Sequence, residues 1–290
     1  MKKMLIVYNQ SISHDTFIEK NKLLIDTCKN YGWAVDCASN TDMFTFLDCN
    51  KAKCHSRFSV YNCCLFFDYD YALAKNLELV GVKVINSGRA IEDCSNKASM
   101  YQEMIKNNIN IPKTIILPSL KKYALTDVSK FIDDAITELN LPLIVKGWYG
   151  NSGENIYLAR TKNDVYKIID HFKCENLLMQ EYISESAGTD IRIFVAYGKV
   201  ISAIRRQGAQ GDFRSNTSQG GTMEKYIPTV IDTKIAINAA GAMGCDFAVV
   251  DILKSVHGSL VCEVNPTCNI NHFYDVTKAN IAEALVKNLK

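Results

Sequence analysis

Apolar and polar positions alternate in blocks along the first 90 residues of the chain. Short apolar runs with the sequences LIVY, WAVDC, CLFF and VKVIN predict buried strands. A helical pattern over residues 17–31 lies between the first two runs. Because strands alternate with helical segments, this part of the chain is expected to form a small parallel α/β unit.

The middle of the chain repeats this alternation. Residues 90–108 have a helical pattern, which Pro112 prevents from continuing. From residue 113 to about 181, strand-like runs combine with helical patterns over residues 127–138 and after Thr161. We expect a second α/β segment here, with strands at TIILP, PLIVKG, NIYLA and LLMQEYI.

The C-terminal third contains longer strand-like runs, DIRIFVAYG and KVISAIRRQ, which look antiparallel. Helices are predicted around residues 229–242 and 276–289. Between them, apolar runs at 247–253 and 260–265 flank a mostly polar turn, and this pattern predicts a β-hairpin. The expected fold class is therefore α/β, with an α+β C-terminal part.

Three polar residues interrupt the apolar strands of this hairpin. Glu263 and Asn265 are two apart and point to the same face of their strand, and Asp251 can lie opposite them. Two carboxylates and an amide oxygen form an all-oxygen site suited to magnesium that carries nucleotide phosphates. Asp251 alone would fit a strand end facing water, but burying all three without a cation would be costly.

Composition narrows the function classes. The 290 residues carry a formal net charge of +2, so a general nucleic-acid binder is not indicated. No apolar run approaches the roughly 20 residues of a membrane span. The apolar stretch within MKKMLIVYNQ is too short for the hydrophobic region of a signal peptide. The eleven cysteines are scattered, without metal-ligand spacing. We expect reduced thiols in a cytoplasmic protein.

A lysine at the end of a buried strand is a candidate phosphate ligand. Lys146 follows PLIV and precedes a loop with Gly147, Gly150 and Gly153, whose backbone can approach a phosphate closely. The loop matches neither the P-loop nor the dinucleotide fingerprint, and an ordinary β-turn is an equal alternative. Lys97, near the start of the helix SNKASMYQEMI, is a second candidate that by itself would be an ordinary solvated lysine.

Polar residues are dense between positions 178 and 216. The run LMQEYI ends a strand whose edge could bind a purine, with Glu181 reaching a ribose or amino group. Asp190 and Arg192 alternate onto one face of the next strand. Arginines are bidentate partners for phosphate or carboxylate, although each could instead form a surface ion pair. The further candidates are Arg205, Arg206, Arg214, Ser215 and Asn216.

The ordered set NKASMYQ, PLIVKGWYGNSGENIYL, LMQEYI, GTDIRIFV, GDFRSN, GCDFAVVDIL and CEVNP resembles the RimK-type ATP-grasp ligases from about residue 90 to 266. The resemblance implies an N-terminal α/β domain over residues 1–90 and an ATP-grasp region over 91–290. Within that region it implies a central subdomain at about 113–181 and a C-terminal subdomain at about 182–290, with ATP clamped between them.

The resemblance also implies roles for individual residues. Asp251, Glu263 and Asn265 would bind two magnesium ions, with Glu263 bridging them and manganese as an alternative. Lys146 and Arg214 would be catalytic. The residues that would bind ATP are Lys97, Lys146, Gln180, Glu181, Tyr182, Ile183, Asp190, Arg214, Ser215 and Asn216.

The chain departs from the family pattern at two places. Asn96 stands where many relatives have aspartate, and the segment Pro266-Thr267-Cys268-Asn269 lacks the Ser/Pro/Gly turn common in the family. The second change borders the acceptor site, so it bears on acceptor identity and not on ATP chemistry.

The implied reaction is attack of a substrate carboxylate on the γ-phosphate of ATP, followed by displacement of phosphate from the acylphosphate by an amine. Glutamate or a similar amino acid is the expected amine, with a peptide or small-molecule carboxylate as acceptor, and the family implies a homo-oligomer. An ATP-grasp kinase and a non-catalytic ATP-binding regulator remain alternatives. A Rossmann-type oxidoreductase is disfavoured by the missing glycine fingerprint.

Overall fold

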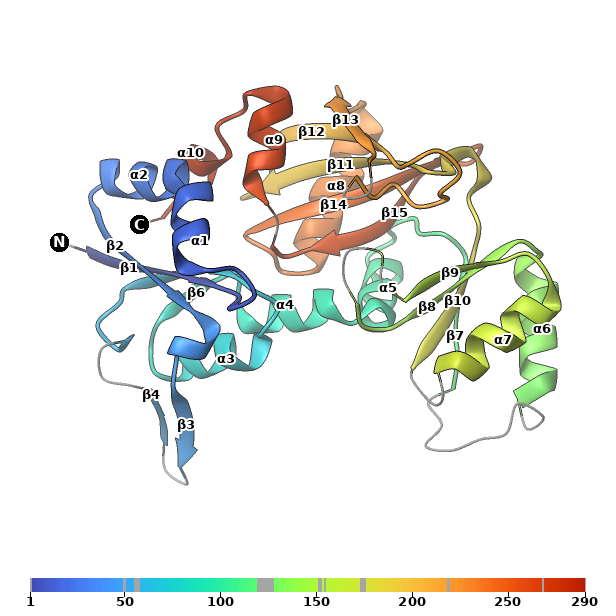
Figure 1. The fold of residues 1–290 in the computed structure, drawn as a ribbon, viewed down its shortest axis with the longest axis horizontal. Coiled ribbons are helices and arrows are strands. Elements are labelled where there is room, and N and C mark those ends of the chain that lie inside the picture. Colours follow the sequence, from blue (N-terminus) through green and yellow to red (C-terminus); the bar gives the residue numbers. More distant parts are fainter. Residues whose placement is uncertain are drawn as a thin grey trace.

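The computed structural model of the chain describes residues 2–48, 51–54 (backbone only), 58–118, 128–150, 153, 155–172, 176–217, 220–267 and 269–289. Three sheet-containing units follow one another along the chain (Figure 1). The N-terminal unit and the C-terminal unit lie together, and the central unit projects to one side of them.

The N-terminal unit is a parallel sheet, as its alternating pattern predicts. Its strand order is β2-β1-β5-β6, and every neighbouring pair is parallel. The strands are β1 (Lys2–Tyr8), β2 (Trp33–Ser39), β5 (Cys63–Phe67) and β6 (Lys83–Ile85). The helices are α1 (His14–Lys20), α2 (Lys22–Asn30), α3 (Tyr71–Leu79) and α4 (Gly88–Ser95).

Two details of this unit differ from the sequence prediction. The single helix predicted over residues 17–31 is two helices, because Asn21 ends α1 and precedes α2 with a non-helical backbone. The hairpin of β3 (Thr45–Asp48) and β4 (Lys51–Cys54) was not predicted, since its first strand is mostly exposed and has no alternating apolar face.

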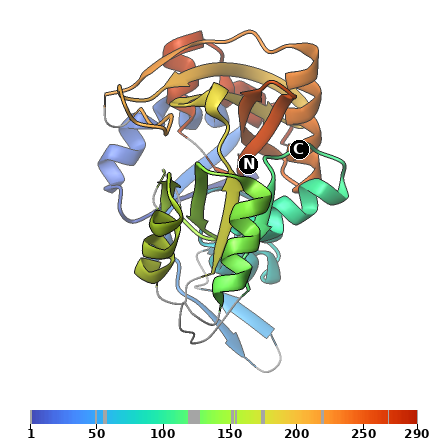
Figure 2. The ribbon, with the colours of Figure 1, turned by 90° about the vertical axis from the view of Figure 1, so that its right-hand side faces the viewer.

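The central unit is an antiparallel sheet of order β7-β10-β8-β9. Its helices cover the outer face of the sheet, away from the N-terminal unit (Figures 1 and 2). It has a hydrophobic core of its own. The helix α5 (Lys97–Lys106) precedes it, and its elements are β7 (Thr114–Ile116), α6 (Ser129–Leu139), β8 (Leu143–Gly147), β9 (Ile156–Ala159), α7 (Lys162–Phe172) and β10 (Leu177–Glu181).

The C-terminal unit is a five-stranded antiparallel sheet of order β13-β12-β11-β14-β15. The predicted hairpin is present, with a tighter turn than expected, since its strands extend to Ser255 and from Gly258. Helix α8 packs on this hairpin. The elements are the 3₁₀ turn η4 (Ser184–Ser186), β11 (Thr189–Ala196), β12 (Lys199–Gln207), β13 (Thr222–Lys225), α8 (Val230–Ala242), β14 (Phe247–Ser255) and β15 (Gly258–Asn265).

The end of the chain joins the C-terminal unit to the N-terminal one. The single helix predicted over residues 276–289 is wrong: α9 (Ile270–Thr277) ends where Lys278 adopts φ 59°, and α10 (Ile281–Val286) begins after the capping residue Asn280. Helix α10 packs on α2, and one core cluster joins residues of both units. In the part of the chain that is described, no helix has the length and apolar character needed to cross a membrane.

Candidate active site

The open end of the β14–β15 hairpin brings together the three polar residues predicted to bind metal. Asp251 pairs with Glu263 across the two strands, and Val249 pairs with Asn265. A bulge lies next to Asp251, between it and Ile252. The Asn265 amide also donates to Asp251 Oδ2 at 3.4 Å. The prediction that Asp251 lies opposite these residues is therefore confirmed for Glu263, and Asn265 reaches Asp251 through its side-chain amide.

Asp251 is buried in a network of ion pairs. Arg192 binds it in bidentate fashion, with Nε at 2.8 Å from Oδ1 and Nη2 at 2.6 Å from Oδ2. Arg206 Nη2 lies 3.3 Å from the same Oδ2. Burial by itself would raise the pKa of Asp251, but the charges of Arg192 and Arg206 outweigh it and hold that pKa below its usual value. The carboxylate is therefore ionised and acceptor-only.

A second carboxylate extends this network along β11. Asp190 receives Arg206 Nε at 2.8 Å and pairs with Arg206 Nη2 as well. The hydroxyl of Ser215 donates to Asp190 Oδ2 at 2.6 Å. Asp190 and Arg192, predicted to share one face of the strand, thus both belong to the ion-pair network of Asp251 and Arg206. Arg206 joins the predicted ribose ligand to the predicted metal ligand.

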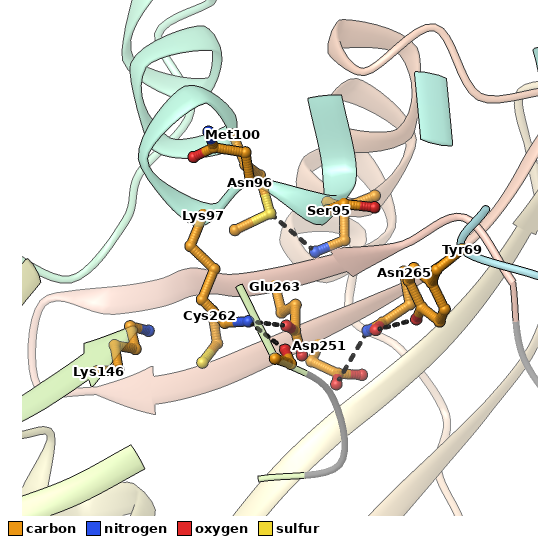
Figure 3. A network of polar contacts seen from close by, with 12 residues as sticks. Tyr69, Ser95, Asn96, Lys97, Met100, Lys146, Asp251, Cys262, Glu263 and Asn265 are labelled. Carbon is orange, nitrogen blue, oxygen red and sulfur yellow. Dashed lines mark hydrogen bonds and ion pairs between the residues drawn. The ribbon is translucent and has the colours of Figure 1, made fainter. Parts of the chain in front are cut away.

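Lys97 connects the N-terminus of α5 to the hairpin. Its Nζ lies 3.1 Å from Glu263 Oε1 and donates to the carbonyl of Gly150 at 2.7 Å (Figure 3). Asn96 is the N-cap of α5, with its Oδ1 accepting from Ala98 N at 3.0 Å. The asparagine that departs from the family pattern therefore acts as a helix cap.

Lys146 is a buried cation with neutral partners. Its side chain on β8 donates to the hydroxyl of Tyr101 at 2.6 Å and to Gln180 Oε1 at 2.8 Å. The residue is only 3% exposed, and burial lowers the pKa of its ammonium. Among the residues that the structure describes, no carboxylate forms an ion pair with it. A desolvated ammonium in this setting favours an anionic ligand.

The glycine loop after β8 approaches the loop that carries Arg214. Arg214 donates to the carbonyl of Gly153 at 3.3 Å, and also binds Asp212. A Cβ at Gly153 would lie 2.4 Å from the side-chain nitrogen Nδ2 of Asn216, and Gly153 has φ +78°. The positive φ favours glycine here, and the missing side chain leaves room for the end of the Asn216 side chain. The loop residues 151, 152 and 154 lie outside the described part of the chain.

The interpretation of residues 178–183 as a sheet edge is wrong for residues 178–180. Strand β10 lies between β7 and β8 and pairs with both in antiparallel fashion. Glu181 lies at the end of the strand, where its Oε1 accepts from Lys113 N at 2.7 Å. Tyr182 and Ile183 follow the strand and lead into η4.

The four arginines of the sequence analysis all have acidic partners in this structure. Arg192 and Arg206 bind Asp251, as described above. The remaining two pairs are Arg205 with Glu224 at 3.9 Å and Arg214 with Asp212 at 2.9 Å. A substrate carboxylate would have to exchange with these partners.

The donor set at the hairpin fits magnesium. Asp251, Glu263 and Asn265 supply hard oxygen atoms from paired positions of two strands. Within the described ranges, no group of three or more His, Cys, Asp or Glu side chains could hold a metal ion. A site here would therefore combine two carboxylates with the Asn265 amide, as the sequence pattern predicts.

Sequence reasoning missed two tyrosines. Tyr101 on α5 bonds Lys146 and donates to the carbonyl of Cys262 at 2.7 Å. Tyr69 follows β5 and donates to Asn265 Oδ1 at 3.2 Å. The second had a usable signal, since polar residues after a buried parallel strand lie at the sheet edge where ligands bind. Tyr101 had no such signal, because it lies in a helical pattern and its partners Lys146 and Cys262 are distant in sequence.

Comparisons with known proteins give the family and the fold of this chain. Residues 94–289 match the model of the RimK-like ATP-grasp domain. A probable alpha-L-glutamate ligase of Maridesulfovibrio salexigens is 35% identical over 221 residues, which cover 75% of this chain and 70% of the relative.

Among solved structures, a RimK domain ATP-grasp protein from Sphaerobacter thermophilus has a TM-score of 0.75 at 16% identity and covers 98% of both chains. The ATP-grasp ligase PsnB, complexed with a phosphomimetic variant of its minimal precursor, Mg and ADP, has a TM-score of 0.69 at 15% identity, with coverage of 99% and 97%.

The fold and the site thus define an ATP-grasp enzyme of the ligase type, which performs ATP-dependent ligation of a carboxylate and an amine. The chain belongs to the RimK-like ATP-grasp family. ATP and Mg²⁺ dependence is general to this fold.

Proposed function

We propose that this enzyme joins glutamate, through its amino group, to the carboxylate of a peptide or small-molecule acceptor. The observation that carries the active-site assignment is the buried ammonium of Lys146, which lies near the oxygen-rich end of the hairpin and forms no described ion pair. The choice of glutamate is supported by the curated relatives, which are described as probable alpha-L-glutamate ligases.

Two lysines would hold the ATP phosphates. Lys146 supplies a desolvated positive charge, and Lys97 can exchange its contact with Glu263 for a phosphate oxygen. Arg214 and Asn216 meet the glycine loop at Gly153, so a phosphate chain under this loop would lie between them and the lysines. Residues 180–183, after or at the end of β10, would line the adenine.

Asp251, Glu263 and Asn265 would hold the magnesium, as two ions bridged by Glu263, with manganese as a substitute. Bound there, magnesium would offset negative charge on the transferring phosphoryl group. Arg192 and Arg206, which now bind Asp251, would then be available to substrate carboxylates or to the acylphosphate. Asp190 would bind the ribose in exchange for contacts that it now makes with Ser215 and Arg206.

The reaction balances without a protein nucleophile. An acceptor carboxylate oxygen forms a bond to the γ-phosphorus, the bond from that phosphorus to the β–γ bridging oxygen breaks, and ADP leaves. The amine of glutamate then attacks the acyl carbon, loses a proton, and displaces inorganic phosphate. The side chains at this site bind and orient the reactants and stabilise charge.

We place domain boundaries near residues 90, 113 and 182, which agrees with the separate core of the central unit. A cytoplasmic location and a homo-oligomer are expected from the family.

The test is a screen for ADP release across the amino acids, with a panel of peptide and small-molecule carboxylates and Mg²⁺, followed by mass spectrometry of the products. The proposal expects ADP release that requires both substrates and a product heavier than the acceptor by one glutamyl residue. ADP release with a phosphorylated acceptor and no condensed product would support the kinase alternative. ATP binding without turnover across the panel would support a regulatory protein.

A further inference from the structure

The N-terminal unit contacts the end of the metal-binding hairpin through a tyrosine. Tyr69 is the second residue after β5, at the carboxyl edge of the parallel sheet. Its hydroxyl donates to Asn265 Oδ1 at 3.2 Å (Figure 3). This oxygen is the only atom of the Asn265 side chain that can bind a cation, because the amide nitrogen is a donor. The tyrosine therefore holds the Asn265 amide by the oxygen that would bind the cation.

The loop that carries Tyr69 is fixed on both sides. Asp68 is buried, and its carboxylate accepts from the Asn9 amide at 3.2 Å and from Tyr69 N at 2.6 Å. Asp70 caps α3 by accepting from Leu73 N at 3.0 Å. With both neighbours held, the backbone of Tyr69 has little freedom. Its hydroxyl is presented to Asn265 from a rigid support.

A second contact fixes the hairpin backbone independently. Asn86, after β6, is fully buried and donates to the carbonyl of Phe247 and to that of Pro266, both at 2.7 Å. It also accepts from Phe247 N at 3.2 Å. Asn86 thus holds the start of β14 and the residue after Asn265. Loss of the Tyr69 hydroxyl would leave this backbone contact in place.

We propose that Tyr69 is a positioning residue for the metal site, which fixes the rotation of the Asn265 amide by holding its carbonyl oxygen from the N-terminal unit, while the amide nitrogen faces Asp251. The inference rests on the proposed role of Asn265 as a metal ligand. Groups that orient ligating side chains in this way typically contribute 10- to 100-fold to metal affinity or activity. The N-terminal unit would then be part of the catalytic site and not only a binding platform for substrate.

The experiment measures Mn²⁺ binding to the full chain with ATP present, from the free-ion electron paramagnetic resonance signal. Tyr69→Phe is expected to weaken Mn²⁺ binding by about 10-fold. ATP binding without metal and the melting temperature should stay unchanged. The matched control is Tyr61→Phe, a similarly half-buried tyrosine of the same unit whose hydroxyl bonds Asp36 at 2.6 Å, and it should leave Mn²⁺ binding unchanged.

Asn265→Ala separates the inference from the proposed function on which it rests. If Asn265→Ala leaves Mn²⁺ affinity intact, the metal assignment itself is wrong. If Asn265→Ala weakens binding but Tyr69→Phe behaves like Tyr61→Phe, the metal assignment survives and the positioning role is wrong. In the Asn265→Ala background, Tyr69→Phe should have no further effect, whereas an additive loss would show that Tyr69 acts by another route.

Discussion

The two ends of the β14–β15 hairpin each hold a buried aspartate, and they differ in what surrounds it. At the turn end, Asp232 of α8 meets Lys254 and Ser259 of the two strands. At the open end, Asp251 meets Arg192 and lies across from Glu263. Both carboxyls have a pKa below their usual value. A lowered pKa therefore does not tell a functional carboxylate from a structural one.

The difference lies in the charge that is left over. Asp232 accepts from Lys254, Ser259, Tyr226 and Thr229, and this network contains one acid and one cation. At the open end, the acids Asp190, Asp251 and Glu263 form ion pairs with the cations Lys97, Arg192 and Arg206. The further cation Lys146 donates hydrogen bonds to the neutral side chains of Tyr101 and Gln180. A complete network is typical of a structural role. A buried cation without a carboxylate partner indicates a place for an anion.

The largest expected effect is at the open end. Glu263→Gln conserves size but removes the charge that now pairs with Lys97. We expect turnover to fall by at least about 100-fold, in line with the loss of one key electrostatic group. Steady-state ADP release at saturating Mg²⁺ measures this. The control is Glu224→Gln, an exposed glutamate on β13, which should keep full activity. Near-normal turnover of the Glu263 variant would contradict the assignment.

Lys146→Met tests the unpaired cation. A charge-assisted hydrogen bond to phosphate is worth about 1.5–3 kcal/mol, so ATP should bind about 10- to 150-fold more weakly. The melting temperature should not fall by much, because a buried desolvated ammonium contributes little to stability. Isothermal titration calorimetry with ATP and a thermal melt are sufficient. A variant that melts far lower but binds ATP normally would make Lys146 a structural residue.

Asp232→Asn is expected to lower the stability of the protein and to leave its activity unchanged, which is the opposite of the pattern expected for Lys146→Met. The hydrogen bonds of its partners overcome burial, which alone would raise its pKa, and they lower the Asp232 pKa from 3.8 to about 2. This difference corresponds to about 2 kcal/mol of stability. Because the folded pKa is depressed, the contribution is complete above about pH 4 and is lost as the pH falls through about 2.

The measurement for Asp232→Asn is chemical unfolding of the variant and the parent chain between neutral pH and pH 2.5. The stability gap should be about 2 kcal/mol at neutral pH and should shrink below pH 4. The turnover number of the folded variant should match that of the parent. A gap that is constant with pH, or a variant that is stable but inactive, would remove the distinction between the two ends.

The smallest effect is expected for Thr229→Ala. Thr229 caps α8 by accepting from Asp232 N at 3.1 Å, and Asp232 in turn accepts from Thr229 N. Loss of such a cap costs about 1 kcal/mol. A modest fall in melting temperature with unchanged ADP release is the expected result. A loss of activity at constant stability would show that the turn end also acts on the reaction.

Local pattern was sufficient to predict most strands and the hairpin with its three polar residues. The pairing of Asp251 with Glu263 follows from a short hairpin, where sequence separation is small. The break between α1 and α2 at Asn21 was not predictable, because a helix can continue through such a residue without loss of its apolar pattern.

Contacts between distant segments were beyond the sequence. The sequence did not reveal that β7 pairs with the strand of Glu181, or that Glu181 Oε1 accepts a hydrogen bond from Lys113 N. The network of Arg206 with Asp190 and Asp251 depends on the order β12-β11-β14 in the sheet. One chain without its relatives does not specify that order, although each residue in the network was a candidate.

The most direct test of the account is to follow oxygen from the acceptor into phosphate. The enzyme is incubated with ATP, Mg²⁺, glutamate and an acceptor whose carboxylate carries ¹⁸O, and the released phosphate is analysed by mass spectrometry. Ligation through an acylphosphate requires one labelled oxygen to appear in phosphate for each amide formed. If amide accumulates while the phosphate stays unlabelled, the carboxylate is activated by another route and the proposed mechanism is wrong.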